Sequence, residues 1–211
     1  MVQKSPPSGT DARPRGRPRG FDSDTALDQA RSAFWNTGYA ATSLDDLSAA
    51  TGLNRPSLYG AFGDKRALYM AALEKSRAEL TSSLTAALAP DEPLRQGLER
   101  VYAVAATIYA RGEIAQRGCF LIGTAVTEAV ADPQIRRVLG EALDEIDGAF
   151  EERFRRARAA GDLSAGLDPA GLAKLATATL NGMAVRARAG ADQATLGAFG
   201  QALVEMICGA G

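Results

Sequence analysis

The residue types that carry most acid–base and nucleophilic chemistry are sparse in this sequence. None of its 211 residues is a histidine, which excludes Ser-His-Asp and Cys-His catalysis, the HExxH zinc site and every imidazole base. The phosphate-binding patterns GxxxxGKS/T and GxGxxG do not occur either. We therefore expect no enzymatic activity, no metal and no cofactor.

The clusters of charged residues that remain fit structural roles. Asp22 with Asp24, and Asp45 with Asp46, lie at expected helix starts, where carboxylates complement the helix dipole. The run EERFRRAR over residues 151–158 has the pattern of a solvated helix face with local charge pairs. Neither pattern predicts a catalytic site.

The sequence contains two cysteines, Cys119 and Cys208, which do not form a disulfide framework, so a cytoplasmic location is expected. A reactive thiolate needs positive charge nearby, and Arg117 stands two residues before Cys119. Cys119 is therefore a candidate redox or electrophile sensor. The alternative, a small inert residue in the core, is the more usual fate of a buried cysteine.

The composition indicates an all-α protein of one or two domains. Hydrophobic residues make up 46% of the chain, alanine is abundant, and the alternating pattern of strands is missing. No apolar run approaches the roughly 20 residues of a membrane span. The N-terminus lacks the apolar segment of a secretory signal.

Residues 42–66, TSLDDLSAATGLNRPSLYGAFGDKR, are the most informative stretch. They predict two short helices joined by a tight turn. Ser43 or Thr42 can cap the first helix, and Asp46 or Asp45 stands three residues later, as in a capping box.

The second short helix has equally clear boundaries. Gly52 ends the preceding helix, because glycine accepts the left-handed conformation, and Asn54 is a new N-cap with Pro56 tolerated in the first turn. Leu58 and Phe62, four residues apart, face inward. This is the layout of a helix-turn-helix, whose second helix enters the major groove of DNA.

The segment LDDLSAATGLNRPSLYGAFGDKRALY resembles the DNA-binding signature of the TetR family of bacterial transcriptional repressors. The similarity is close from about Phe21 to Tyr69 and weak beyond, as expected of a family whose C-terminal halves diverge with their ligands. It implies a three-helix DNA-binding domain over residues 21–66, then a larger helical domain for ligand binding and dimerisation over residues 67–211. The alternative, a helical hairpin with no nucleic-acid role, would not require the turn glycine, cap, proline and Gly-Asp-Lys in this order.

The resemblance also places DNA contacts on individual residues. Arg55, at the start of the recognition helix, could contact guanine O6 and N7, and Ser57 could serve either base type. Tyr59, Lys65 and Ser43 would hold phosphates. Gly60 is small where family members often present larger side chains, which suggests close approach to thymine methyl groups. The expected contacts in this unit are Ser43, Arg55, Pro56, Ser57, Tyr59, Gly60 and Lys65.

The N-terminal residues 1–20 form a predicted disordered basic arm, rich in Pro, Gly, Ser and Arg. Their net charge is +4, against -5 for the remainder of the chain. The run RPRGRPRG contains PRGRP, which is similar to the core of an AT-hook that lies in a narrow A·T minor groove. Arg15, Arg17 and Arg19 are the expected contacts. The alternative is a solvated tail with nonspecific affinity for phosphates.

The C-terminal part shows helix caps and breaks at regular intervals. They predict helices over residues 65–87, 91–111, 119–130, 133–160, 168–189 and 192–208, with residues 111–118 as a loop. The last two helices carry apolar stripes and many small residues, which favours an antiparallel pair that meets its copy across a two-fold axis. The predicted dimer contacts are Leu172, Leu175, Thr179, Met183, Leu196, Phe199, Leu203 and Met206. The alternative is that these stripes cover only the core of the monomer.

Members of the TetR family bind a small molecule among their middle helices. Glu128 is the most informative candidate, because in the apolar run GTAVTEAV it is either a surface residue or a specific polar contact. The candidate ligand contacts, each equally compatible with plain core, are Tyr102, Tyr109, Phe120, Thr124, Thr127, Glu128, Phe150 and Phe154.

The sequence thus predicts a homodimeric repressor that binds a palindromic operator in double-stranded DNA and is released by an unknown small molecule. A ligand-independent architectural DNA-binding protein that relies on the basic arm is the alternative.

Overall fold

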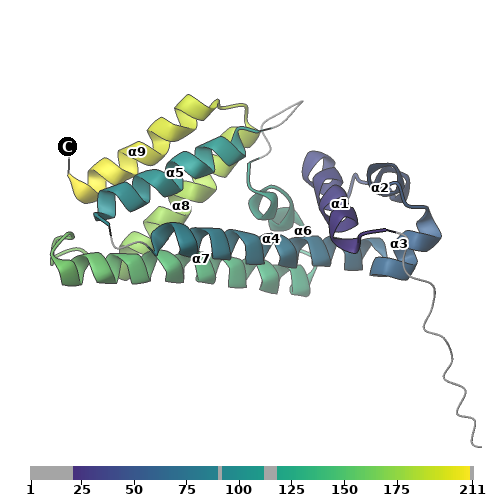
Figure 1. Cartoon of the computed structure of the whole chain (residues 1–211), viewed down its shortest axis with the longest axis horizontal. Helices are drawn as coiled ribbons and strands as arrows, with labels where there is room; N and C mark the ends of the chain where they lie inside the picture. The colour runs from purple at the N-terminus through teal and green to yellow at the C-terminus, as the bar shows by residue number, and fades with distance from the viewer. Residues whose placement is uncertain (1–20, 90–91, 112–117, 210–211) are drawn as a thin grey trace, which may run out of the picture.

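The computed structural model describes residues 21–89, 92–111 and 118–209. The predicted basic arm, with Arg15, Arg17 and Arg19, lies outside these ranges, and so does most of the predicted loop at 111–118. Every regular element of the described residues is helical (Figure 1). The helices are α1 (Ser23–Thr37), α2 (Leu44–Thr51), α3 (Arg55–Phe62), α4 (Lys65–Leu88), α5 (Leu94–Tyr109), the π-helix η1 (Leu121–Ala125), α6 (Val126–Glu128), α7 (Pro133–Ala160), α8 (Pro169–Arg188) and α9 (Gln193–Cys208).

Helices α1 to α3 form a small unit at one end of the molecule (Figure 1). Its centre is made by Phe34, Leu47 and Leu58, one from each helix, which are all but fully buried. Burying such side chains contributes about 1.5–3 kcal/mol each. Burial of these apolar side chains therefore packs α1, α2 and α3 together.

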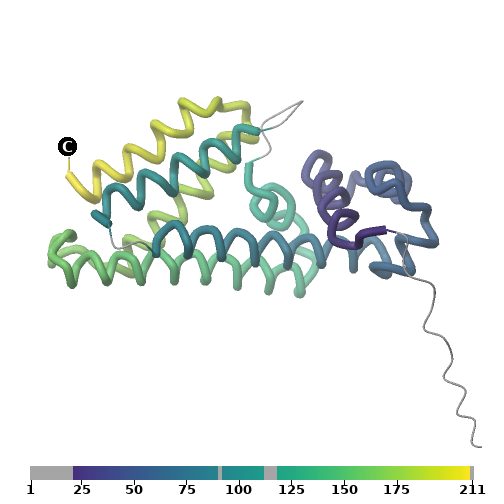
Figure 2. The backbone as a smooth tube through the Cα atoms, viewed as in Figure 1, coloured from purple at the N-terminus to yellow at the C-terminus, as the bar shows by residue number. Residues whose placement is uncertain are grey.

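The long helix α4 joins this unit to the rest of the chain. It runs beside α7 in the same direction (Figure 2): Arg66 at its start binds Asp132, and Arg156 of α7 donates to the Leu88 carbonyl at its end. Midway, Arg77 contacts Glu145 over 3.1 Å. Because α4 runs without interruption across residues 66 and 67, the predicted domain boundary falls inside a helix.

Helices α5, α8 and α9 complete the body, with α8 packed against both α7 and the α5–α9 pair (Figure 1). Contact between α5 and α9 depends on Gly200. A Cβ at this position would lie 2.5 Å from the Cβ of Tyr102, closer than two carbon atoms that are not bonded to one another can approach. Helices α8 and α9, which the sequence predicts as a pair rich in small residues, therefore also form part of the core of the monomer.

The segment predicted as one short helix over residues 119–130 has a different form. It is a π-helical turn, η1, that continues into the short α6. Gly118 precedes it with a φ of 65°, and a Cβ there would lie 2.4 Å from the Ala184 carbonyl oxygen of α8. Such turns are rare and often occur at functional sites.

No helix within the described ranges is long and apolar enough to span a membrane.

Candidate nucleic-acid interface

The first helix of the helix-turn-helix is held by the predicted capping box. The Ser43 hydroxyl accepts from the Asp46 backbone N–H over 3.1 Å, and the Asp46 carboxylate accepts from the Ser43 N–H over 2.8 Å. Gly52 ends α2 in the left-handed conformation, with a φ of 65°. The turn thus relies on the residues that the sequence places there.

The recognition helix α3 is fixed at its start and along one side. Asn54 caps it by accepting from the Ser57 N–H over 2.9 Å, and Leu58 anchors its inner face. Its opposite side is open to solvent. Arg55, Pro56, Tyr59 and Gly60 are exposed there and Ser57 is half-buried, so the predicted base and backbone contacts of α3 gather on its outer side.

The Arg55 side chain has a partner that the sequence did not reveal. Its Nε and Nη2 lie 3.1 Å and 2.7 Å from Oδ1 of Asp45 in α2. This hydrogen-bonded carboxylate raises the pKa of Arg55. The guanidinium is therefore oriented across the two helices before it meets DNA, although both side chains remain largely exposed and the pair is screened by solvent.

The two other predicted phosphate contacts lie at the edges of the unit. The Ser43 residue is exposed, but its hydroxyl is used in the helix cap. Lys65 is half-buried, with its Nζ 4.5 Å from the centre of the Tyr39 ring and 3.4 Å from the Ala40 carbonyl oxygen. A cation–π contact of this kind positions the ammonium group without neutralising its charge.

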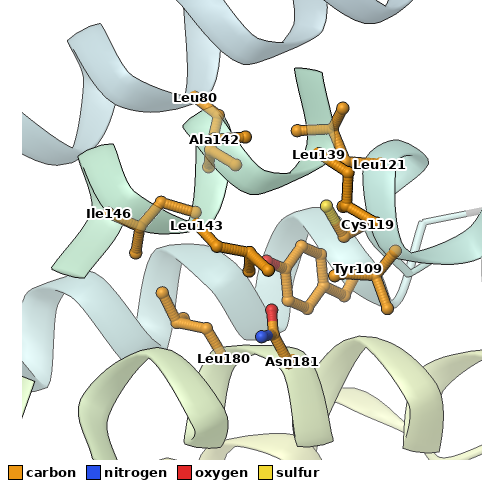
Figure 3. A pocket seen from close by; sticks show the side chains of 11 residues that line it. Leu80, Tyr109, Cys119, Leu121, Leu139, Ala142, Leu143, Ile146, Leu180 and Asn181 are labelled. Carbon is orange, nitrogen blue, oxygen red and sulfur yellow. The ribbon is translucent and has the colours of Figure 1, made fainter. Parts of the chain in front are cut away.

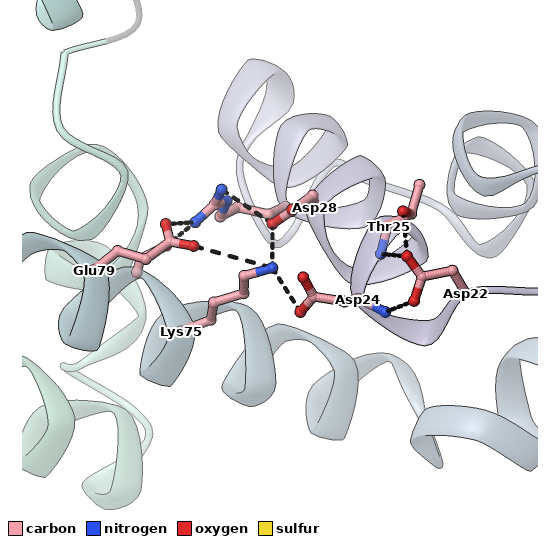
Figure 4. Close-up of polar contacts among 8 residues, drawn as sticks. Asp22, Asp24, Thr25, Asp28, Lys75 and Glu79 are labelled. Carbon is pink, nitrogen blue, oxygen red and sulfur yellow. Dashed lines mark hydrogen bonds and ion pairs between the residues drawn. The ribbon is translucent and has the colours of Figure 1, made fainter.

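Ion pairs fasten α1 to α4 (Figure 4). Lys75 of α4 lies 2.8 Å from both Asp24 and Asp28 of α1. Arg31 of α1 reaches back to Glu79 of α4. A movement of α4 is therefore passed to α1, which carries the other two helices of the DNA-binding unit.

An open pocket of about 370 Å³ in the helical body is lined by Trp35, Phe120 and Leu121 among others. Beside it lies a smaller and more enclosed one, the closed cavity (Figure 3), which holds about 10 Å³, roughly the space of one water molecule. Two predicted residues, Tyr109 and Cys119, line it. The lining that the sequence did not indicate consists mostly of aliphatic side chains: Leu80, Leu121, Ile122, Leu139, Ala142, Leu143, Ile146, Leu180 and Asn181.

The Cys119 thiol is buried in this wall, and burial raises its pKa. A high pKa keeps the sulfur protonated and less reactive. The packing thus favours an inert role for Cys119 in this arrangement, and its use as a sensor stays a prediction.

The other candidate ligand contacts are dispersed. Tyr102, Phe150 and Phe154 stack on one another in the core, with ring centres 6.4 Å and 6.2 Å apart. None of these three lines the closed cavity. Their role as ligand contacts stays a prediction.

The candidates on η1 and α6 differ from one another in environment. Phe120 and Thr124 are buried at the base of the DNA-binding unit. Thr127 is exposed and Glu128 is half-buried, so neither points into the closed cavity. The half-buried position of Glu128 fits a residue at the protein surface better than a specific polar contact to a ligand.

The predicted dimer contacts fall into two groups. Leu172, Met183, Leu196 and Leu203 are buried in the chain's own core, so their part in a dimer interface stays a prediction. Leu175, Thr179, Phe199 and Met206 lie on the outer side of α8 and α9. The apolar periodicity of α8 and α9 does not by itself distinguish the side that faces the core from the side that faces outward.

A capped helix-turn-helix with an outward recognition helix, carried on an all-helical body, defines a DNA-binding transcriptional regulator. The family model for bacterial regulatory proteins of the tetR family matches residues 26–72, and the model for the tetracyclin repressor-like C-terminal domain matches residues 97–203. The chain belongs to the tetR family of bacterial regulatory proteins. The predicted family and fold class are confirmed.

Several relatives support this assignment. The HTH-type transcriptional repressor ComR of Escherichia coli K12 is 31% identical over 179 residues, which cover 84% of this chain and 85% of ComR. The repressor BdcR of the same organism is 33% identical over 58% of this chain and 60% of its own. Among solved structures, a cysteine mutant of the regulator CifR complexed with 26-base-pair operator DNA is 32% identical, with a TM-score of 0.76 over 90% of this chain and 98% of that one.

Proposed function

We propose that this protein is a homodimeric transcriptional repressor that binds a palindromic operator through α3 and is released from it by a small molecule. The observation that carries the proposal is the outer side of α3, where Arg55, Tyr59 and Gly60 are exposed toward a potential major groove while Leu58 anchors the helix from within. The related proteins named as repressors, and the operator complex of CifR, support the same role.

The dimer is supported by the outer side of α8 and α9. Leu175, Val185 and Met206 are large apolar residues that remain 49%, 58% and 65% exposed. Leu175 and Val185 belong to α8, and Met206 belongs to α9 together with the partly exposed Phe199. An apolar stripe of this kind on both copies makes an isologous interface, which a palindromic site requires.

Release by a ligand is supported by the body of the protein. The closed cavity lies among α4, α5, η1, α7 and α8, and it has an apolar wall with the two polar groups of Tyr109 and Asn181. Such a lining suits a small, mainly apolar molecule. We further infer that the protein acts in the cytoplasm, where bacterial DNA is found.

The DNA-binding side is tested by selecting operator duplexes from random DNA with the purified protein and then measuring Arg55→Ala. We expect the variant to lose about 5- to 150-fold in affinity for the selected operator, because a bidentate contact to guanine is lost, and to relax specificity at one base pair in each half-site.

The matched control is Arg155→Ala. Arg155 is an exposed arginine of α7 that also pairs with a carboxylate, Glu151, at 2.5 Å, but it lies far from α3. Its loss should leave operator affinity unchanged. If Arg55→Ala bound the selected operator as tightly and as selectively as the wild type, α3 would not be the helix that reads the bases.

A further inference from the structure

The buried hydrogen bond between Tyr69 and Thr124 joins the DNA-binding side of the molecule to the body. The Tyr69 hydroxyl of α4 donates to the Thr124 hydroxyl over 2.8 Å, and the Thr124 hydroxyl donates in turn to the Phe120 carbonyl over 2.8 Å. Tyr69 is fully buried and Thr124 is 3% exposed. These two hydrogen bonds connect α4 to the π-helical turn η1. A π-helical turn has a less regular backbone than an α-helix, so it can adopt an alternative arrangement more easily.

An aromatic cluster extends from the same tyrosine into the DNA-binding unit. The Tyr69 ring lies 5.1 Å from Phe34 and 4.7 Å from Tyr39, and it lies 6.0 Å from Phe120 on the other side. Phe120 also contacts Trp35 of α1, with ring centres 5.8 Å apart. Rings packed in this way cannot move independently, because the interior of a protein is close-packed.

The cluster reaches a residue that is expected to touch DNA. The Tyr39 ring supports the ammonium group of Lys65, 4.5 Å away, directly after the recognition helix. A shift of the Tyr69 ring therefore moves the Tyr39 ring, and with it the ammonium group of Lys65.

The other end of the path lies at the closed cavity. Cys119 and Leu121, on either side of Phe120, form part of the cavity wall. A volume of about 10 Å³ is too small for an organic ligand, so a ligand can enter this cavity only when its wall moves. The same wall, at Cys119, Phe120 and Leu121, faces the open pocket of about 370 Å³, from which a ligand could push it. In a repressor released by its ligand, the arrangement that excludes the ligand is the one that binds the operator.

We propose that the Tyr69–Thr124 hydrogen bond is the contact through which the cavity controls the DNA-binding unit. It holds η1 and the aromatic cluster in the operator-binding arrangement, and a ligand that opens the cavity moves η1 and breaks it. Tyr69 and Thr124 are thus positioning residues that act through Phe120, Tyr39 and Lys65. This inference rests on the proposed function as a ligand-released repressor.

The test compares Tyr69→Phe, Thr124→Val and the double variant in operator affinity and in thermal unfolding, using the operator selected by the wild-type protein. We expect each single change to weaken operator binding by about 5-fold, as for one lost buried hydrogen bond. The operator affinity of the double variant should be little lower than that of the single variant that binds the operator less tightly. The two residues form one hydrogen bond, so removing both partners costs little more than removing one.

The matched control is Tyr102→Phe. Tyr102 is also a buried tyrosine whose hydroxyl donates to a protein oxygen, the Ala176 carbonyl, over 3.1 Å, but it lies within the core of the body. The unfolding temperature of the Tyr102→Phe variant should fall about as much as that of Tyr69→Phe, and its operator affinity should not change. This separates a loss of coupling from a general loss of stability.

Two results would overturn the inference, and they can be told apart. If Tyr69→Phe and Thr124→Val bound the operator with wild-type affinity, or lost no more than Tyr102→Phe, the hydrogen bond would have no part in the control of DNA binding, while the proposed function would stand. If the wild-type protein itself selected no operator, the proposed function would fail, and this inference with it.

Discussion

Replacing Gly60 by glutamate is expected to abolish operator binding without unfolding the protein. Gly60 is exposed on the outer side of α3, and a Cβ at this position would have no atom within 4 Å, so a larger side chain fits. The new carboxylates, one in each copy, would face DNA phosphates and base edges. Placing like charges together costs several kcal/mol, and we expect operator affinity to fall by more than about 100-fold in a fluorescence anisotropy titration.

Two matched variants make this result specific. Gly60→Ala adds a side chain without charge and should still bind the operator, with α3 slightly more stable. Gly148→Glu introduces the same charge at an exposed glycine of α7 that also has open space around it, and it should bind like the wild type. Operator binding by Gly60→Glu at wild-type affinity would mean that DNA meets another face of the protein.

Placing aspartates at Leu175 and Met206 together is expected to convert the protein to a monomer. Both side chains are exposed in the single chain, so the change should leave the fold intact while it puts unpaired charges into the proposed interface. Size-exclusion chromatography with light scattering measures the mass. Operator affinity should fall by more than about 100-fold, because two linked half-site contacts become two separate weak ones.

Phe199→Asp should also break the dimer, but it is the less informative variant. The Phe199 ring packs on Gly182 and lies 4.4 Å from the Arg186 guanidinium, so its loss also affects the monomer. The matched control is Val130→Asp, which places the same charge at a valine that is 78% exposed after α6, away from α8 and α9. A dimeric mass for the double aspartate variant would place the interface on another surface.

The helix-turn-helix could be predicted from the sequence because its determinants are local. The reciprocal Ser43–Asp46 cap, the left-handed Gly52 and the Asn54 cap each depend on residues within three positions of one another. The later caps are local in the same way: Asp132 accepts from the N–H of Gln134, and other helix starts follow this pattern. Helix boundaries were therefore predictable to within a few residues.

The features that the sequence did not reveal all depend on distant residues. The Arg55–Asp45 pair joins two helices, and the Tyr69–Thr124 hydrogen bond joins residues 55 positions apart. The π-helical form of η1 depends on packing against α4 and α8 and has no characteristic residue pattern. The division of the α8 and α9 stripes into an inner and an outer face likewise becomes visible only when α5 and α7 are in place.

Reciprocal coupling between ligand and operator is the defining property of a repressor that its ligand releases. A library of small metabolites is screened for release of fluorescently labelled operator, and the compound that releases it is then titrated into the protein with and without operator DNA. We expect operator DNA to weaken binding of this compound by the same factor, about 5- to 150-fold, by which the compound weakens operator binding. Equal affinities for the compound in the two titrations would contradict release of the operator by a ligand and leave a ligand-independent architectural protein as the better description.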